Sequence, residues 1–396
     1  MQQITYATVH PKFKKLYKSG YPLITKDSFD TKKFVEGDII NIVDEKKEFI
    51  AKCYIGFQNK GYGWVLSNSK DEKIDLDFFK NKINKAIKKR ENFFNSNDTT
   101  AFRVFNAEGD GIGGLSIDYF DGFYLITWYS KGIYKFKDLI IKALTAVAKC
   151  KGIYQKRRFN TKGQYLEDSS DFVLGEKAPE PLVIKENGVN FAIYLDDGAM
   201  VGIFLDQKDV RKAIKERYAK GKSVLNTFSY TGAFSVAAAV GGASKTTSVD
   251  LANRSRAKTQ EQFRLNSIDF NSQNIIVEDV FNYFKYAIRK KLSFELVILD
   301  PPSFARSKKH TFSASKDYTK LLEDAINITS KNGVIVASTN AANFDMKKFK
   351  SFIDRAFKNL KVKYTILETF SLPSDFKVNK NFKEGNYLKV VFIKKL

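Results

Sequence analysis

The sequence contains little cysteine and no hydrophobic run long enough to cross a membrane. Cys53 and Cys150 are the only cysteines among 396 residues, and they lie far apart in the chain. A disulfide framework and a CxxC metal motif are therefore excluded within this sequence, which fits a reducing compartment. No segment approaches the roughly 18 consecutive apolar residues of a membrane helix, and the N-terminus lacks the apolar core of a signal peptide. We therefore expect a cytoplasmic protein without a metal site.

Acidic residues are scarce relative to basic ones. The chain has 67 Lys and Arg residues against 44 Asp and Glu residues, and its net charge is +23. An AT-rich genome could account for many lysines, but the same bias should also raise glutamate. Basic side chains neutralise phosphates and release counterions, so an excess of this size favours a nucleic acid partner. An acidic membrane surface is the weaker alternative, because the sequence shows no basic amphipathic anchor.

The hydrophobic pattern divides the chain into three predicted domains, 1–73, 74–185 and 186–396. With 43% hydrophobic residues, the chain can bury a sizeable core in each. The first domain contains β-rich runs, such as Asp38–Val43 and Ala51–Gly56, separated by glycine turns. This pattern is typical of a small β-barrel.

The second domain is predicted to mix helices and strands. Apolar residues at helical spacing predict a helix over Ile74–Phe94, and a second helix is expected at 136–149. A polar, less regular stretch then leads to a strand pair at 182–195. Further strands are expected near 102–105, 114–117 and 123–129. The domain should therefore be of the α+β class.

The third domain alternates strands with helices from about residue 208 onwards. The expected strands lie near 223–226, 246–250, 274–277, 296–299, 334–337, 363–367 and 388–393. Helices fit between the first six strands, which is the pattern of a doubly wound, Rossmann-like α/β sheet. The last two strands leave no room for a crossover helix. The seventh strand should therefore be antiparallel.

Polar residues follow the first three strands of this sheet, where ligands of such folds bind. Gly232 opens a helix after strand one, Asp250 ends strand two, and Asp279-Val280 follows strand three. A carboxylate after strand two can accept hydrogen bonds from ribose hydroxyls. Asp250 alone could be a solvated loop residue, but the ordered set on three strand ends predicts a nucleoside site. The absence of a GxGxxG motif disfavours a nicotinamide or flavin dinucleotide.

The loop after strand four is predicted to carry catalysis. Asp300 ends a buried strand, and Pro301 and Pro302 stiffen the loop that follows by fixing φ. Phe304 could stack on a base, and the basic residues Arg306, Lys308 and Lys309 could reach phosphates. A purely structural turn is the alternative interpretation of Asp-Pro-Pro.

Strand five leads into a second polar loop. There Asn340 could contact a base edge through its amide. Asparagine also favours turns, so a purely structural loop is an equal alternative.

Four motifs resemble the class I methyltransferases that modify large-subunit ribosomal RNA and carry an N-terminal PUA domain. They are FNAEGDGIGGLSIDYF (105–120), GIFLDQKDVR (202–211), NTFSYTGAFSVAAAVGGA (226–243) and LDPPSFARSK (299–308), and they occur in the family's order. The resemblance implies that S-adenosylmethionine is the cofactor and that 23S rRNA, or a ribosomal assembly particle, is the partner. It also implies that the first domain is an RNA-binding PUA barrel, and it allows a homodimer.

The resemblance assigns roles only to residues that match its motifs. Asp250 would hold the ribose of the cofactor, Asp279 and Val280 the adenine, and Asp300 would stand beside the transferred methyl group. The residues expected around the methionine part, or lining the same pocket, are Phe204, Asp206, Gln207, Phe228, Ser229, Tyr230, Thr231 and Gly232.

One departure from the family concerns the target atom. Relatives that methylate cytosine C5 use a cysteine after strand five, because a thiolate must first add to the base. Here Ser338 and Thr339 stand in that stretch. The sequence also resembles the guanine-N7 methyltransferase domain of a fused 23S rRNA methyltransferase, and N7 needs no covalent nucleophile. We therefore expect N7 methylation. Methylation of an exocyclic amino group such as guanine N2, C5 methylation by an unusual nucleophile, and a non-catalytic assembly factor remain the alternatives.

Overall fold

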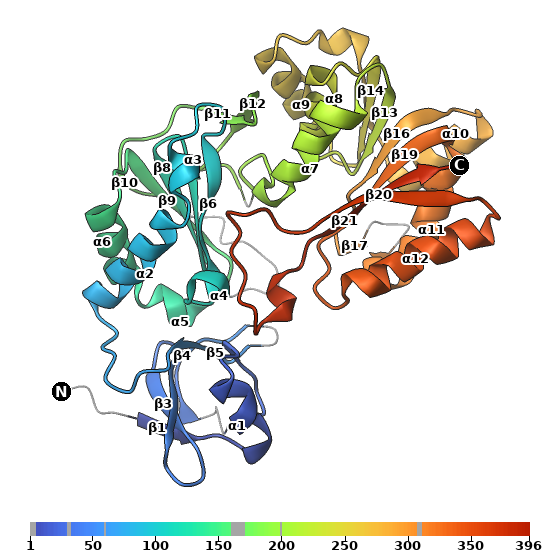
Figure 1. Ribbon diagram of the computed structural model, residues 1–396. Coiled ribbons are helices and arrows are strands. Elements are labelled where there is room, and N and C mark those ends of the chain that lie inside the picture. Colours follow the sequence, from blue (N-terminus) through green and yellow to red (C-terminus); the bar gives the residue numbers. More distant parts are fainter. Residues whose placement is uncertain (1–4, 30–32, 59–60, 160–170, 199, 307–310) are drawn as a thin grey trace. The chain divides into compact units, whose positions relative to one another are not determined.

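The structure is a computed structural model that describes residues 5–29, 33–58, 61–159, 171–198, 200–306 and 311–396. The chain forms two compact units (Figure 1). Unit 1 comprises Met1–Leu182, Tyr194–Val201 and Ser374–Gly385, and unit 2 comprises Val183–Ile193, Gly202–Pro373 and Asn386–Leu396. Because this division does not separate the first two predicted domains, the three-domain organisation stays a prediction.

Unit 1 begins with a five-stranded sheet in the order β1-β3-β4-β5-β2. Its strands are β1 (Thr5–Thr8), β2 (Leu23–Ile24), β3 (Ile39–Val43), β4 (Phe49–Ile55) and β5 (Gly63–Ser67). The sequence predicted β3 and β4 but not the helix α1 (Pro11–Lys18), which starts with a proline at its first position. Tyr17 from this helix is fully buried among the apolar side chains of the strands. The helix therefore helps to fill the core of this small β domain.

A second five-stranded sheet follows, in the order β10-β9-β8-β7-β6. The strands are β6 (Ala101–Asn106), β7 (Leu115–Phe120), β8 (Phe123–Trp128), β9 (Gly152–Arg157) and β10 (Phe172–Gly175), and the main helices are α2 (Leu76–Lys88) and α6 (Lys137–Val147). Figure 1 shows α2 and α6 beside this sheet. Their side chains form one hydrophobic cluster with it.

Two expectations for this region were wrong. The stretch expected to be irregular contains β9, which ends in the polar residues Gln155–Arg157, and β10, which has only four residues. The helix predicted over Ile74–Phe94 ends at Lys88, and a short helix α3 (Glu91–Phe94) follows Arg90.

Unit 2 is built on a seven-stranded sheet in the order β15-β14-β13-β16-β19-β21-β20. Its strands are β13 (Ser223–Thr227), β14 (Lys245–Asp250), β15 (Asn274–Val277), β16 (Phe294–Leu299), β19 (Thr329–Thr339), β20 (Tyr364–Phe370) and β21 (Lys389–Lys395). The first five strands run parallel to one another, whereas β21 is antiparallel to both β19 and β20. The predicted Rossmann-like sheet with an antiparallel last strand is confirmed.

Helices cover both faces of this sheet. The helices are α7 (Lys208–Ala213), α8 (Ala233–Val240), α9 (Arg254–Leu265), α10 (Val280–Arg289), α11 (Ala314–Asn327) and α12 (Met346–Asn359). In β16, Leu296 and Ile298 pack with side chains of α7 and α8, whereas Val297 and Leu299 pack with α10, α11 and α12. A central parallel strand is thus buried on both faces, which explains its continuous apolar sequence. Among the described residues, the helices are too short or too polar to span a bilayer.

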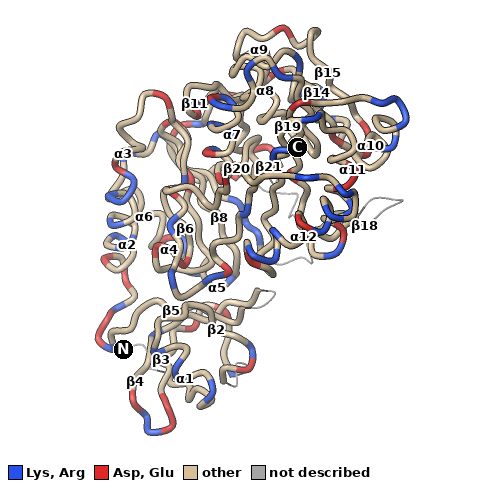
Figure 2. The backbone as a smooth tube through the Cα atoms, turned by 45° about the vertical axis from the view of Figure 1, so that its right-hand side comes forward, with Lys and Arg blue, Asp and Glu red and all other residues tan. Residues whose placement is uncertain are grey.

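Basic residues far outnumber acidic ones on α2 of unit 1 and on α12 of unit 2. Helix α2 carries four lysines and one acidic residue, and α12 carries five Lys or Arg residues and one acidic residue. Figure 2 shows these residues in blue along both helices. Each helix therefore offers a positive stripe beside its buried face.

The Glu108–Gly114 turn holds the two sheets of unit 1 together. Trp64 of β5 donates a hydrogen bond from Nε1 to Oε1 of Glu108 at 2.7 Å. Tyr54 of β4 donates from Oη to the carbonyl oxygen of Gly113 at 2.6 Å. Both aromatic side chains are almost fully buried. The glycine-rich motif at 105–120 therefore has a packing role against the first sheet of unit 1.

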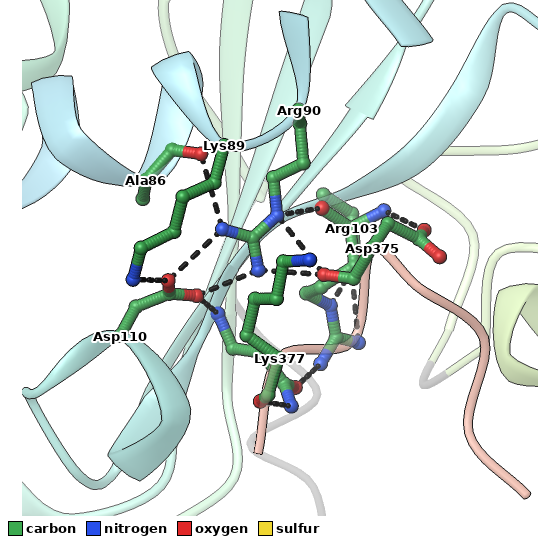
Figure 3. A network of polar contacts seen from close by, with 9 residues as sticks. Ala86, Lys89, Arg90, Arg103, Asp110, Asp375 and Lys377 are labelled. Atoms are coloured by element: carbon green, nitrogen blue, oxygen red, sulfur yellow. Dashed lines mark hydrogen bonds and ion pairs between the residues drawn. The ribbon is translucent and has the colours of Figure 1, made fainter. Parts of the chain in front are cut away.

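A buried ion pair joins this turn to the segment Ser374–Gly385 (Figure 3). The guanidinium of Arg90 donates from Nη1 and Nη2 to the two carboxylate oxygens of Asp110, at 2.9 and 2.7 Å. Its Nη2 also donates to the main-chain oxygen of Asp375 at 2.6 Å, and the Asp375 carboxylate accepts the amide of Arg103. The network ties the end of α2, the turn and this late segment of the chain into one unit.

The Arg90–Asp110 pair should matter for the stability of unit 1. We expect Asp110→Ala to lower its free energy of unfolding by about 3–5 kcal/mol, because a buried guanidinium would lose its carboxylate partner. Urea unfolding followed by tryptophan fluorescence measures this unit, since both tryptophans, Trp64 and Trp128, lie in it.

A matched control removes an exposed carboxylate from the same unit. Asp77 forms an exposed pair with Lys80, so Asp77→Ala should change the free energy of unfolding by less than about 1 kcal/mol. Unfolding of both variants at the same urea concentration would contradict the assigned role of the buried pair.

Candidate functional site

The loop after β13 has an unusual backbone. Phe228, Tyr230 and Gly232 have φ angles of 54°, 51° and 77°. Such left-handed conformations cost roughly 1–3 kcal/mol at non-glycine positions and cluster at ligand sites. Ser229 and Thr231, which alternate with them, are buried, and the Thr231 hydroxyl donates to a main-chain carbonyl at 2.7 Å. The loop is therefore held in a fixed, strained conformation at the N-terminus of α8.

Asp250 is the last residue of β14 and fixes this loop. Its Oδ2 accepts the amide of Tyr230 at 2.8 Å, and its Oδ1 accepts the amide of Ala252 at 2.9 Å. Each carboxylate oxygen can accept a further hydrogen bond. Asp250 thus combines two tasks: it shapes the loop after β13, and it presents acceptors that suit a ribose diol.

Asp279 lies at the end of the neighbouring strand and caps helix α10. Its Oδ1 accepts the amides of Phe281 and Asn282, at 2.9 and 3.3 Å. No hydrogen bond from the described residues reaches Oδ2, which remains suited to an amino group such as that of adenine. Val280 is only 4% exposed and belongs to the core, so it has little surface for a ring. Phe281 is partly buried and lies nearer the loop, with its ring centroid 6.2 Å from that of Phe228.

Asp300 follows β16 and is held by two side chains from other segments. The Gln207 amide donates from Nε2 to Oδ1 of Asp300 at 3.0 Å and to the Ser338 hydroxyl at 2.8 Å. Desolvation raises the pKa of Asp300 to about 6, although a hydrogen bond from Ser338 works in the opposite direction. The carboxylate is therefore ionised at neutral pH but poorly hydrated, a state suited to interaction with a positive charge.

The loop after Asp300 exposes an aromatic ring. Pro301 is buried and Pro302 is exposed, while Phe304 is 64% exposed. The Ser303 hydroxyl donates to the exposed Asn340 side chain, from the loop after β19, at 2.5 Å. The structure thus brings the two predicted loops together.

The phosphate contacts expected for the basic residues after Phe304 stay a prediction. Lys308 and Lys309 lie outside the described residues, and only the backbone of Arg306 is described.

The FLDQ segment reaches the same edge of the sheet. Phe204 is 41% exposed, and its ring centroid is 5.5 Å from that of Tyr230. The Asp206 carboxylate accepts the hydroxyl of Tyr387 at 2.8 Å. Gln207 faces Asp300 rather than the loop after β13. Phe204 therefore accompanies the expected cofactor loop, whereas Gln207 belongs with the carboxylate.

Residues that the sequence did not single out support these side chains. The Arg211 guanidinium pairs with Glu186 through hydrogen bonds of 2.6 and 2.7 Å and also donates to the Phe204 carbonyl. Arg211 belongs to the GIFLDQKDVR motif, so the sequence could have indicated that it supports the site. Nothing in the sequence pointed to Tyr387, which stands before the last strand, or to Tyr318, whose buried hydroxyl donates to the Ser338 carbonyl.

The chemistry of this donor set fits a nucleoside with a charged tail. Carboxylates end or follow β14, β15 and β16 at one edge of the sheet, and the strained loop with aromatic side chains follows β13, which lies between β14 and β16. Among the described residues, no cluster of three His, Cys, Asp or Glu side chains could hold a metal ion.

Two family models match the chain. A model described as S-adenosylmethionine-dependent methyltransferase matches residues 103–358, and a PUA-like domain model matches residues 7–68. The PUA-like match falls on the first sheet of unit 1, as the sequence predicted.

Similar proteins cover almost the whole chain. The Bacillus subtilis (strain 168) protein named "Putative ribosomal RNA large subunit methyltransferase YwbD" is 59% identical over 96% of both chains. The Aeromonas salmonicida (strain A449) protein named "Ribosomal RNA large subunit methyltransferase I" is 30% identical over 91% of both chains. The crystal structure of SMU.776 complexed with SAH is 42% identical, covers 99% of this chain and 100% of its own, and superposes with a TM-score of 0.92.

The glycine at the start of α8 can be tested with a matched pair of substitutions. Gly232 and Gly188 have the same φ of +77°, but a Cβ on Gly232 would lie 2.5 Å from Cγ2 of Thr259, whereas a Cβ on Gly188 meets nothing within 4 Å. We expect Gly232→Ala to weaken S-adenosylmethionine binding by at least about tenfold, because the loop or α9 must move. Isothermal titration calorimetry measures the affinity.

Gly188→Ala carries the same backbone strain without the steric contact, and its affinity should stay close to that of the native protein. Equal affinities of the two variants for S-adenosylmethionine would show that the loop before α8 does not belong to the cofactor site.

Proposed function

Because the chain belongs to the S-adenosylmethionine-dependent methyltransferase family, we propose that it methylates guanine N7 in the RNA of the large ribosomal subunit. The observation that carries the choice of atom is the edge of the sheet around Asp300: among the described residues it presents a carboxylate and an exposed aromatic ring, whereas the hydroxyls of Ser338 and Thr339 are buried.

RNA as the substrate is supported by three independent features. The two curated relatives are named as ribosomal RNA large subunit methyltransferases. A PUA-like domain, an RNA-binding module in the family that the sequence resembles, precedes the rest of the chain. The net charge is +23, and α2 and α12 carry positive stripes that suit phosphates (Figure 2).

N7 is favoured over cytosine C5 because neither of the two cysteines, and neither Ser338 nor Thr339, is suited to nucleophilic attack. Desolvation raises the pKa of the buried Cys53 thiol far above neutrality and that of Cys150 to about 11, and both cysteines belong to unit 1. Ser338 and Thr339 are 1% and 0% exposed, and their hydroxyl groups take part in hydrogen bonds. Guanine N7 has an available lone pair, so the protein needs only to orient the base.

Each side chain at the reaction edge then has a defined task. S-adenosylmethionine supplies an electrophilic methyl group. The exposed ring of Phe304 stacks on the unstacked guanine, and the Asn340 amide contacts its edge. Alkylation leaves a positive charge on the base, and the ionised Asp300 offsets that charge. Pro301 and Pro302 keep the loop rigid while the base is bound.

The cofactor would be held by the first three strand ends. Asp250 accepts hydrogen bonds from the ribose, and Asp279 accepts one from adenine. Phe204 and Asp206 complete the wall of the pocket. The residues that surround the methionine part are Phe228, Ser229, Tyr230, Thr231 and Gly232.

Nucleoside mass spectrometry of 23S rRNA tests this proposal. We expect one 7-methylguanosine to disappear when the gene is deleted, and to return when the native gene is supplied. The double variant Cys53→Ser/Cys150→Ser should restore it as well, because no thiol takes part. Asp300→Ala should not restore it, although the purified variant should still bind S-adenosylmethionine.

Loss of 5-methylcytidine upon deletion, or failure of the double cysteine variant alone, would refute the choice of N7. An unchanged rRNA nucleoside profile after deletion would refute the choice of substrate.

A further inference from the structure

We propose that Gln207 and Ser338 form a clamp that orients the carboxylate of Asp300, so that Gln207 is a positioning residue for the reaction and not a ligand of the cofactor. This inference rests on the proposed role of Asp300 in methyl transfer. It gives a role to the FLDQ motif and to Ser338 near the end of β19.

The orientation of the Gln207 amide is fixed by its surroundings. Its nitrogen lies 3.0 Å from Oδ1 of Asp300 and 2.8 Å from the Ser338 hydroxyl. An ionised carboxylate only accepts hydrogen bonds, so the amide must present its NH₂ group to Asp300. The amide oxygen then faces away, and no donor among the described residues reaches it. The side chain is 3% exposed, and the amide oxygen itself is buried, so a ligand bound at the surface does not meet it.

Burying an amide oxygen without a partner costs free energy. The chain accepts this cost at a site where the amide nitrogen makes two hydrogen bonds. A side chain that served only packing would be better replaced by an apolar one. The donor that faces Asp300 therefore explains the amide at this position better than packing does.

A buried ion pair between Arg211 and Glu186 holds the clamp in place. Gln207 ends a single helical turn, η2 (Leu205–Gln207), directly before α7. Arg211 on α7 donates to the Phe204 carbonyl at the start of this turn and is itself bound by Glu186. Both charged side chains of the pair are almost fully buried. The backbone before Gln207 is thus held at the Phe204 carbonyl, and α7 follows directly after Gln207.

Ser338 supplies the other half of the clamp. Its hydroxyl accepts from Gln207 and hydrogen-bonds to Asp300, which lowers the pKa of that carboxyl group. Its carbonyl oxygen accepts the hydroxyl of Tyr318. With these contacts, the serine is placed as a structural donor rather than a substitute for a catalytic thiol.

The clamp should also control when Asp300 is ionised. Desolvation and the neighbouring Asp206 raise its pKa, whereas the Ser338 hydroxyl, the Arg211 guanidinium and the Gln207 amide lower it, to a balance of about 6. The buried phenol of Tyr318 faces the same carboxylate. If the ionised form is the active one, the rate rises with pH through about 6 and is level above it. Removing either donor moves this midpoint upwards.

The test compares kcat–pH profiles of the full-length protein at saturating S-adenosylmethionine and RNA. For Gln207→Met, which keeps the size of the side chain, we expect the midpoint to rise by about one pH unit. The plateau rate should fall roughly tenfold, as losing one charge-assisted hydrogen bond implies. Ser338→Ala should move the midpoint in the same direction. Gln207→Glu should move it further, because a second carboxylate would face Asp300.

The affinity for S-adenosylmethionine separates a positioning role from cofactor binding. It should change less than about twofold in Gln207→Met, since the amide does not meet the cofactor. A tenfold loss of affinity with an unmoved midpoint would overturn the proposal and make Gln207 a cofactor ligand.

Matched controls come from the same unit. Gln262 is equally buried and uses its amide to bind the backbone of Ala192, and Thr329 lies at the opposite end of β19 with its hydroxyl bound to a carbonyl. Gln262→Met and Thr329→Val should lower thermal stability but leave the midpoint unchanged. If they moved the midpoint as far as Gln207→Met does, general loosening of the fold would be the cause and the clamp would be refuted.

The titration of Asp300 can also be measured by NMR without RNA, so the clamp can be tested independently of the proposed function. In protein labelled with ¹³C at aspartate Cγ, the resonance that disappears in Asp300→Asn should titrate near pH 6, and its midpoint should rise in Gln207→Met. This result stands even if the RNA substrate is wrong. An unmoved Asp300 resonance would overturn the clamp even if the RNA substrate is right.

Discussion

A carboxylate held partly out of water shapes the reaction edge of unit 2. Desolvation raises the pKa of Asp300 to about 6, and an ionised group in such a place is costly unless donors face it. The Gln207 amide and the Ser338 hydroxyl are those donors. Because the carboxylate has few water molecules around it, a positive charge that forms nearby interacts with it more strongly than it would in bulk water. The desolvation of Asp300 therefore lowers the stability of the fold, but it strengthens the interaction of the carboxylate with a positive charge in the reaction.

The topology of the sheet makes this arrangement possible. In a parallel sheet, the carboxyl ends of the strands meet at one edge, and side chains distant in sequence come together there. Gln207 is 93 positions from Asp300 and 131 from Ser338. The antiparallel strand β21 begins at the same edge and brings Tyr387 to Asp206. One edge therefore holds the expected cofactor groups on β13 to β15 and the reaction groups on β16 and β19.

The sequence predicted those features that depend on local patterns. Alternating strands and helices gave the Rossmann-like sheet, and the missing crossover gave the antiparallel last strand. Carboxylates at strand ends located Asp250, Asp279 and Asp300. The Gln207–Ser338 clamp could not be predicted, because it depends on the packing of three segments that share no local pattern.

Other elements were missed for the same reason. Arg90 resembles a surface residue in the sequence, yet it is fully buried against Asp110 and marks the end of α2. Val280 was expected to contact a ring but lies in the core. The segment Ser374–Gly385 belongs by its contacts to unit 1, although the strands on either side of it belong to unit 2. In each case the decisive contact is with a residue far along the chain, which no periodicity reveals.

The most direct test of the central claim replaces the target atom itself. Transcripts of the modified rRNA region can be prepared with guanosine or with 7-deazaguanosine, in which a C–H group takes the place of N7 while N1, N2 and all cytosines remain. Incorporation of a labelled methyl group from S-adenosylmethionine is then measured for both transcripts. The account predicts stoichiometric methylation of the guanosine transcript and none of the 7-deaza transcript. Equal methylation of the two would show that the methyl group goes elsewhere, and that Asp300 is not placed to offset a charge on N7-alkylated guanine.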